Sequence, residues 1–144
     1  MNDKTEPEKL DKAAIQAIFT RSPFISSLNL EVVSLDYDAM AITVRMPQSP
    51  TMERRPGTKQ FHGGPLAAFI DIVGDFAIGM MVGGGVPTMN LRIDYLKPAV
   101  GDAVIGTAVV RRRGRSAAVV DIDVTNEDGG LVAVGRGTYV PVAG

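Results

Sequence analysis

Three residues that could do chemistry lie in or beside the most apolar stretch of the chain, FHGGPLAAFIDIVGDFAIGMMVGGG at 61–85. His62 is the only histidine, and Asp71 and Asp75 are the only charges between residues 65 and 82. A carboxylate in so apolar a segment costs several kcal/mol unless it is paired or neutralised. Burial of a carboxyl group also raises its pKa toward the range of a general base. Asp71, with no basic residue within a helical turn, is therefore the first candidate for catalysis.

The segment that follows His62 has the composition of a helix start that could bind a carbonyl group. Pro65 suits the first turn of a helix, whose N-terminus presents unpaired N–H groups and a partial positive charge. Glycine at such a position lets a ligand approach the backbone closely. Gly63 and Gly64 are thus candidates for an oxyanion site, although a simple tight turn explains the same residues. A lone histidine such as His62 more often orients a loop than performs catalysis.

The spacing of these residues separates them within one chain. Asp71 lies nine residues after His62, which is about 12–13 Å along a helix axis. If both ends are catalytic, a second copy must bring its helix start beside the first copy's Asp71, and an antiparallel pair of helices in a symmetric dimer would do so. Asp75 shares the helical face of Asp71 and either lines the same cavity or reaches solvent.

Hydrophobic periodicity predicts the elements that position these residues. Helical spacing predicts two helices, at 7–20 and 65–82, with Pro7 opening the first and Gly83 ending the second. Alternation of apolar and polar residues predicts six strands, near 28–36, 40–46, 90–95, 103–112, 117–125 and 131–140. This order predicts an α+β fold in which a mostly antiparallel sheet curls against one long buried helix. We expect one domain over 1–144, with an N-terminal helical extension at 1–27 and a core at 28–140.

Composition excludes several classes of function. The net charge of −1 does not favour nucleic acid or an anionic membrane as a bulk partner. The absence of cysteine excludes disulfides and thiolate chemistry, and a single histidine excludes a multi-histidine metal site within one chain. The charged N-terminus lacks the pattern of a signal peptide, and the apolar run at 65–82 carries two aspartates, unlike a typical membrane span. We expect a cytoplasmic protein with no metal and no membrane contact.

Taken together, the motifs resemble those of the PaaI-type acyl-CoA thioesterases of the hotdog fold. HGGPLAAFID, with an acid nine residues after the histidine, is similar to that family's motif. The stretches TMNLRIDYLKPAVGD, RRRGRSAAVVDIDV and LVAVGRGTY resemble its strands, so the likeness covers about residues 28–140. The resemblance implies a curved sheet wrapped around one helix and a homodimer, often paired into a tetramer, with active sites across the dimer interface. It also implies an acyl-CoA substrate and no further cofactor.

The resemblance assigns roles to individual residues. Asp71 would be the general base or nucleophile, and the Gly63 N–H would polarise the thioester carbonyl. His62 would shape this end of the site, with Gly64 beside it. Thr88 matches a position where the family often has a hydroxyl that contacts the water or the substrate.

One position departs from the family pattern. Six residues before the histidine, where the family commonly has Asn or Gln, this chain has Pro56. Gln60 and Thr58 are the nearby polar residues that could replace it. CoA carries phosphates, so basic residues are expected near the cleft mouth, and the candidates are Arg54, Arg55, Arg111, Arg112, Arg113 and Arg115. Any one of them is equally well explained as a solvated turn residue; Arg113 is the one we assign to substrate binding.

The sequence thus predicts an acyl-CoA thioesterase that hydrolyses an aryl- or short- to medium-chain acyl-CoA to the free acid and CoA. One alternative is a hotdog dehydratase or hydratase acting on acyl thioesters, with His62 and the partner's Asp71 as its acid–base pair. Another is a non-catalytic acyl-CoA-binding protein, an interpretation that Pro56 keeps open.

Overall fold

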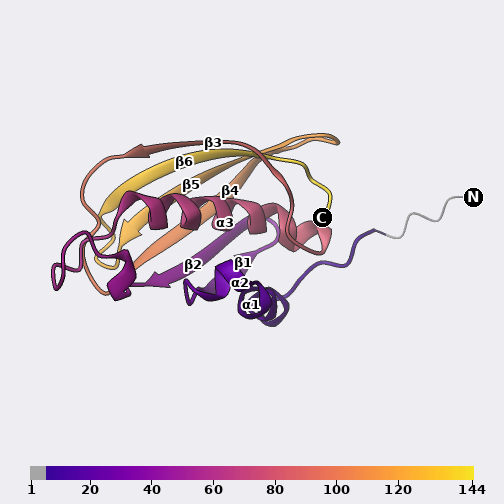
Figure 1. The fold of residues 1–144 in the computed structure, drawn as a ribbon. Coiled ribbons are helices and arrows are strands. Elements are labelled where there is room, and N and C mark those ends of the chain that lie inside the picture. Colours follow the sequence, from indigo (N-terminus) through magenta and orange to yellow (C-terminus); the bar gives the residue numbers. More distant parts are fainter. Residues whose placement is uncertain (1–5) are drawn as a thin grey trace, which may run out of the picture.

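In a computed structural model of the chain, which describes residues 6–144, one antiparallel sheet curves around one long helix (Figure 1). The elements in order are α1 (Lys12–Arg21), α2 (Pro23–Ser26), β1 (Glu31–Asp36), β2 (Ala41–Pro47), the 3₁₀ helix η1 (Pro50–Met52), α3 (Gly63–Val82), β3 (Thr88–Tyr95), β4 (Ala103–Arg113), β5 (Ala118–Asn126) and β6 (Leu131–Tyr139). The sheet has the strand order β1-β2-β4-β5-β6-β3. This arrangement confirms the predicted α+β fold.

The long helix α3 forms because its sequence is apolar on most faces and has clear signals at both ends. His62 is the N-cap residue, and the helix ends at Gly83, whose φ of 92° is the left-handed conformation that glycine favours. By length and hydropathy α3 could cross a membrane, but 67% of its most apolar 18-residue stretch is buried inside the protein. The helix is therefore the centre of the core, as a helix that is apolar on most faces should be in a globular protein.

The sheet supplies a concave apolar face for α3. In β5 the side chains of Val120, Ile122 and Val124 are buried, while Asp121 and Asp123 point to the other face. Two strand glycines allow the helix to come close. A Cβ at Gly106 would lie 2.8 Å from the Phe69 ring, and one at Gly135 would lie 2.6 Å from Ile70 Cγ2. Larger residues at these two positions would push α3 away from the sheet.

The N-terminal region differs from the sequence prediction in three places. The helix α1 begins at Lys12 rather than Pro7, because the Asp11 side chain caps it by accepting the Ala14 N–H at 2.8 Å. After the predicted break, Pro23 opens the short helix α2, which was not predicted. Strand β1 starts at Glu31 rather than residue 28, because Asn29 has a φ of 54° that interrupts the extended backbone.

The two edge strands of the sheet, β1 and β3, differ in what pairs with their outer side. At β1 the side-chain amide of Gln16 donates to the Leu30 carbonyl at 2.8 Å and accepts the Val32 N–H at 2.9 Å. It thus takes the place of a neighbouring strand. At the other edge β3 pairs only with β6, and it exposes 60% of Met89 and 53% of Tyr95. An edge of this kind is available for pairing with another chain.

The side chain of Tyr139 packs against α3 at Gly74, where only glycine leaves enough room for it. A Cβ at Gly74 of α3 would overlap the Tyr139 hydroxyl, whereas one at Gly64 would meet no atom within 4 Å. We expect Gly74→Ala to lower the free energy of unfolding by roughly 1–3 kcal/mol, although alanine is the better helix former. Gly64→Ala should leave it unchanged or raise it by up to about 1 kcal/mol. Urea denaturation measures both, and equal effects would contradict this packing.

Candidate active site

The start of α3 presents backbone donors that the protein itself does not use. The His62 side chain makes no capping bond, no acidic residue lies in the first turn, and Pro65 has no N–H. In the described part of the chain no group accepts a hydrogen bond from Gly63 N–H or Gly64 N–H. The Tyr95 hydroxyl donates to the Gly63 carbonyl at 2.7 Å and so fixes this turn to the end of β3. Two free N–H groups at the positive end of the helix can therefore bind an oxyanion.

A cavity of about 490 Å³ opens at this helix start. His62, Gly63 and Gln60 line it, together with the cationic side chains of Arg54 and Lys97. Sequence analysis named both Gln60 and Thr58 as replacements for the missing Asn or Gln. The structure separates them, because the Thr58 hydroxyl donates to the Arg55 carbonyl at 2.8 Å, inside its own turn. Gln60 is thus the one that reaches the cavity.

Asp71 lies further along α3 and is partnered by hydroxyl groups. The Thr88 hydroxyl donates to Asp71 Oδ1 at 2.8 Å. The Tyr139 hydroxyl donates to the Asp71 carbonyl at 3.1 Å and lies 3.5 Å from Oδ1. Burial, followed by the charge of Asp71, raises the pKa of the Tyr139 phenol, which therefore remains a donor at neutral pH. Thr88 was singled out from the sequence, whereas Tyr139 was not, because it was only one residue of the last predicted strand.

Asp71 is less buried than the sequence predicted. This carboxylate is half-buried rather than enclosed, because it lies on the α3 face that the sheet leaves uncovered. The partnering hydroxyl of Thr88 holds Oδ1, and no hydrogen bond to Oδ2 occurs among residues 6–144. One carboxylate oxygen is thus fixed in place, while the other is free to accept a proton.

The two half-sites do not meet within one chain. Gly63 and Asp71 are eight residues apart on one helix, or about 12 Å at the usual rise. Tyr95 and Thr88, which hold them, are the last and first residues of β3. The structure therefore brings Thr88 to Asp71, and Gln60 and His62 to Gly63, but leaves the two groups separate.

The sequence model of the thioesterase superfamily matches residues 60–133, about half of the chain, including the start of α3, Asp71 and Thr88. The chain belongs to the thioesterase superfamily. The enzyme is a thioester hydrolase, and its curved sheet around α3 confirms the hotdog fold expected from the motifs.

Curated relatives and a solved structure extend this result over most of the chain. The acyl-coenzyme A thioesterase PaaI of Escherichia coli is 26% identical over 129 residues, covering 89% of both chains. The medium/long-chain acyl-CoA thioesterase YigI of Salmonella typhimurium is 26% identical over 137 residues, covering 82% of this chain and 84% of YigI. The structure of the E. coli PaaI protein, from the phenylacetic acid degradation operon, matches with a TM-score of 0.77 and 27% identity, covering 90% of this thioesterase and 91% of that chain.

Asp75 of this thioesterase holds the segment that leads to Thr88. Its Oδ1 accepts the Val86 N–H at 2.7 Å, two residues before Thr88. Burial raises the pKa of Asp75 to about 7, the charge of Asp71 adds to this effect, and the Val86 N–H opposes it. The sequence left open whether Asp75 lines the cavity or reaches solvent. The structure shows neither arrangement directly. The carboxyl group is tied to the backbone behind the site.

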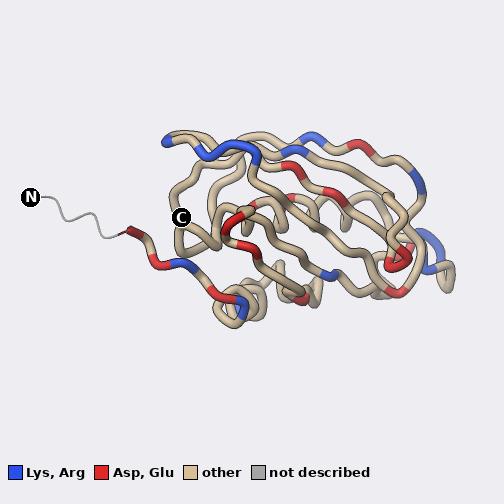
Figure 2. The backbone as a smooth tube through the Cα atoms, turned by 180° about the vertical axis from the view of Figure 1, so that it is seen from behind, with Lys and Arg blue, Asp and Glu red and all other residues tan. Residues whose placement is uncertain are grey.

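Arg113 lies at the Asp71 end of the molecule rather than at the helix start. Register places Arg113, Ala118, Tyr139 and Thr88 in one row across four strands. At about 4.8 Å per strand, the backbones of Arg113 and Thr88 are roughly 14 Å apart. The basic hairpin that contains Arg113 is a separate blue segment at the end of the molecule near the C-terminus (Figure 2).

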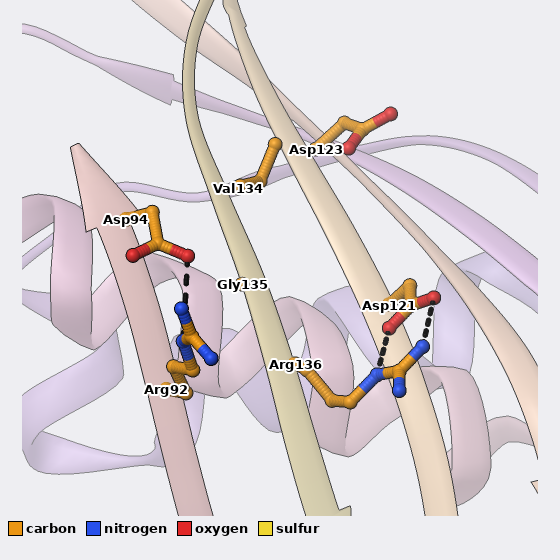
Figure 3. Close-up of a pocket in the computed structure, with 7 residues that line it drawn as sticks. All are labelled: Arg92, Asp94, Asp121, Asp123, Val134, Gly135 and Arg136. Carbon is orange, nitrogen blue, oxygen red and sulfur yellow. Dashed lines mark hydrogen bonds and ion pairs between the residues drawn. The ribbon is translucent and has the colours of Figure 1, made fainter. Parts of the chain in front are cut away.

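A second hollow, of about 440 Å³, lies on the outer face of the sheet over β3, β5 and β6 (Figure 3). Arg136 donates to both carboxylate oxygens of Asp121, at 2.6 and 2.9 Å, and lowers the pKa of that aspartate. Arg92 and Asp94 form another ion pair at 3.4 Å. The sheet stands between this hollow and α3, so these charges belong to the outer surface and not to the site of Asp71.

The raised pKa of Asp75 predicts an unusual pH dependence of stability. Between about pH 4 and pH 7 the folded protein holds a proton at Asp75 that the unfolded chain has released, so stability falls as pH rises through this window. Asn keeps an acceptor for the Val86 N–H but cannot ionise. We expect Asp75→Asn to stabilise the protein at pH 8, by as much as about 4 kcal/mol, and to have little effect at pH 4.

Chemical denaturation at several pH values between 4 and 8 measures this difference. Asp123→Asn, which removes the same charge from the exposed outer face of β5, is the matched control and should keep the pH dependence of the parent protein. A stability gain of Asp75→Asn that is the same at pH 4 and pH 8 would show that Asp75 is not protonated in the folded state.

Proposed function

We propose that this thioesterase hydrolyses acyl-CoA in two composite sites of a homodimer. The observation that carries the proposal is the position of the two half-sites at opposite ends of the same edge strand. The free N–H groups of Gly63 and Gly64 are held at the Tyr95 end of β3, and Asp71 is held at the Thr88 end. One chain therefore carries both parts of a site but cannot use them on one substrate.

Antiparallel pairing of β3 with β3 of a second copy would complete both sites. A twofold axis near the middle of β3 brings the Tyr95 end of one copy beside the Thr88 end of the other. The Gly63 N–H of one chain then faces the Asp71 carboxylate of the other. The same pairing would cover the exposed edge and the apolar side chain of Met89. Pairing of these dimers into tetramers remains a prediction of the family resemblance, and a cytoplasmic location remains a prediction from composition.

In the proposed reaction the two half-sites act together on one thioester. Gly63 N–H, with Gly64 N–H beside it, stabilises the negative charge that develops on the thioester oxygen. Asp71 Oδ2 takes a proton from a water molecule, whose oxygen attacks the carbonyl carbon, while Thr88 holds Oδ1. Collapse of the tetrahedral intermediate breaks the carbon–sulfur bond and releases the free acid. The proton on Asp71 then returns to the thiolate of CoA.

Charges around the helix start support CoA as the leaving group. Arg54 and Lys97 line the cavity at Gly63, and neither forms an ion pair with another residue of the described chain. They are available for the phosphates of CoA. In the proposed dimer Arg113, in the row of Thr88, would approach the partner's cavity from the other side. The names of PaaI and YigI as acyl-CoA thioesterases agree with this substrate class.

Two substitutions test the composite site separately. Asp71→Asn removes the proton acceptor and should lower kcat about 10²–10⁴-fold. Gly63→Pro removes one oxyanion donor and should lower kcat about 10²–10³-fold. Proline is tolerated at the first residue of a helix, and the ψ of 156° at His62 suits a following proline. A Cβ at this position lies 3.2 Å from the Tyr95 ring, which must shift slightly to admit it. Thiol release from a panel of aryl and aliphatic acyl-CoAs gives the rates, and light scattering confirms that each variant stays dimeric.

Mixing the two inactive variants tests whether the site is shared between chains. After co-refolding, each mixed dimer has one site with both halves intact, so random pairing should restore about a quarter of the parent activity. No recovery from folded, mixed dimers would place both halves of the site in one chain and overturn the proposal. Saturable acyl-CoA binding without hydrolysis of any panel member would instead favour a binding protein.

A further inference from the structure

An apolar pocket of about 350 Å³ lies between α2, η1 and the first turns of α3. Phe24 and Leu28 line it from α2 and the turn that follows, Met52 from η1, and Gly64 and Ala68 from α3. In Figure 1 these elements lie on the side of α3 that faces away from β3. The pocket is thus separate from the β3 edge and is made from elements of one chain.

The lining of this pocket suits an apolar guest. Leu28 and Met52 are buried, while Phe24 is 60% exposed at the mouth. No charged residue lines the pocket, and its two hydroxyl groups have partners of their own. The Ser27 hydroxyl donates to the Phe24 carbonyl at 2.6 Å, and the Thr51 hydroxyl lies 3.1 Å from that of Ser49. A ligand therefore meets mainly hydrocarbon, and its burial is driven by the hydrophobic effect.

The pocket lies next to the helix start that presents the free N–H groups of α3. Gly63 lines the cavity that contains Arg54 and Lys97, and the next residue, Gly64, lines the apolar pocket. The His62 N–H donates to the Met52 carbonyl at 2.8 Å, which fixes the pocket floor to the helix start. A thioester carbonyl bound at these N–H groups therefore has a cationic cavity on one side and an apolar pocket on the other. These match the two parts of an acyl-CoA.

We propose that this pocket binds the acyl group of the substrate, and that Phe24 and Ala68 set the size of acyl group accepted. The assignment rests on the proposed function and adds the substrate class: acyl groups with an apolar chain or ring beyond the acetyl carbons. PaaI, from a phenylacetic acid degradation operon, and YigI, a medium/long-chain acyl-CoA thioesterase, are each 26% identical to this chain. Overall sequence identity therefore does not indicate which acyl group this chain accepts, whereas the residues that line the pocket can.

Filling and opening the pocket tests this assignment. Ala68→Leu should lower kcat/KM for hexanoyl-, decanoyl- and phenylacetyl-CoA at least tenfold while changing it less than twofold for acetyl-CoA. Phe24→Ala widens the mouth and should change the ratio of decanoyl- to acetyl-CoA turnover at least threefold. Val33→Ala, which trims an exposed apolar residue outside the pocket, should leave that ratio unchanged. Unfolding curves and the mass in solution confirm that each variant is folded and has the parent's assembly.

Calorimetry distinguishes failure of the pocket from failure of the proposed function. CoA and hexanoyl-CoA are titrated into Asp71→Asn, with and without Ala68→Leu, so that the thioester is not hydrolysed. The filled pocket should weaken hexanoyl-CoA binding at least tenfold and leave CoA binding unchanged. Equal effects on both ligands, or on acetyl- and hexanoyl-CoA turnover, would overturn the pocket assignment even in an active enzyme. If the parent hydrolyses no thioester, the proposed function fails, and the difference between the two ligands still decides the pocket.

Discussion

The close packing of α3 on the concave face of the sheet is the constraint on which the rest of the structure depends. Gly106 and Gly135 let Phe69 and Ile70 lie directly against the strands, and Gly74 makes room for Tyr139. With the sheet covering the apolar faces of the helix, its remaining face stays uncovered. That face carries both aspartates of the segment, so burial of the apolar core and the partial exposure of Asp71 result from a single helix orientation.

The same packing explains why the site stabilises charge with dipoles rather than with cations. Asp71 and Asp75 are like charges on one helical face, and the bonds that hold them come from hydroxyl and backbone N–H donors. A lysine or arginine beside Asp71 would pair with the carboxylate and weaken it as a proton acceptor. The protein tolerates a carboxyl group at Asp75 that ionises only near neutral pH, a local cost of the kind found at functional sites.

Most of the fold was predictable because the signals were local. Alternation in β2 and β5 marks their buried faces, and the apolar run with its terminal glycine marks α3. The start of α1 was missed because the Asp11 cap was not weighed against Pro7. α2 has only four residues, too few for a periodic pattern.

For the site, sequence spacing separated Asp71 from the helix start and the family resemblance singled out Thr88, but neither could show three-dimensional neighbours. Tyr95 and Tyr139 looked like ordinary strand residues, and only the crossing of α3 over β3 and β6 brings their hydroxyls to Gly63 and Asp71. Lys97 was missed because it follows β3 and is far from Gly63 in sequence. Arg113, assigned from charge alone, lies in the row of Thr88 instead of beside Lys97.

The Gln16 amide on β1 has a consequence for how far the sheet can grow. A sheet with two open edges could add copies at both sides and form an endless ribbon. Here the amide occupies one edge, and the irregular register between Val32 and Ser34 disturbs it further. In the proposed dimer, growth by strand addition through β3 would therefore end once two six-stranded sheets had joined.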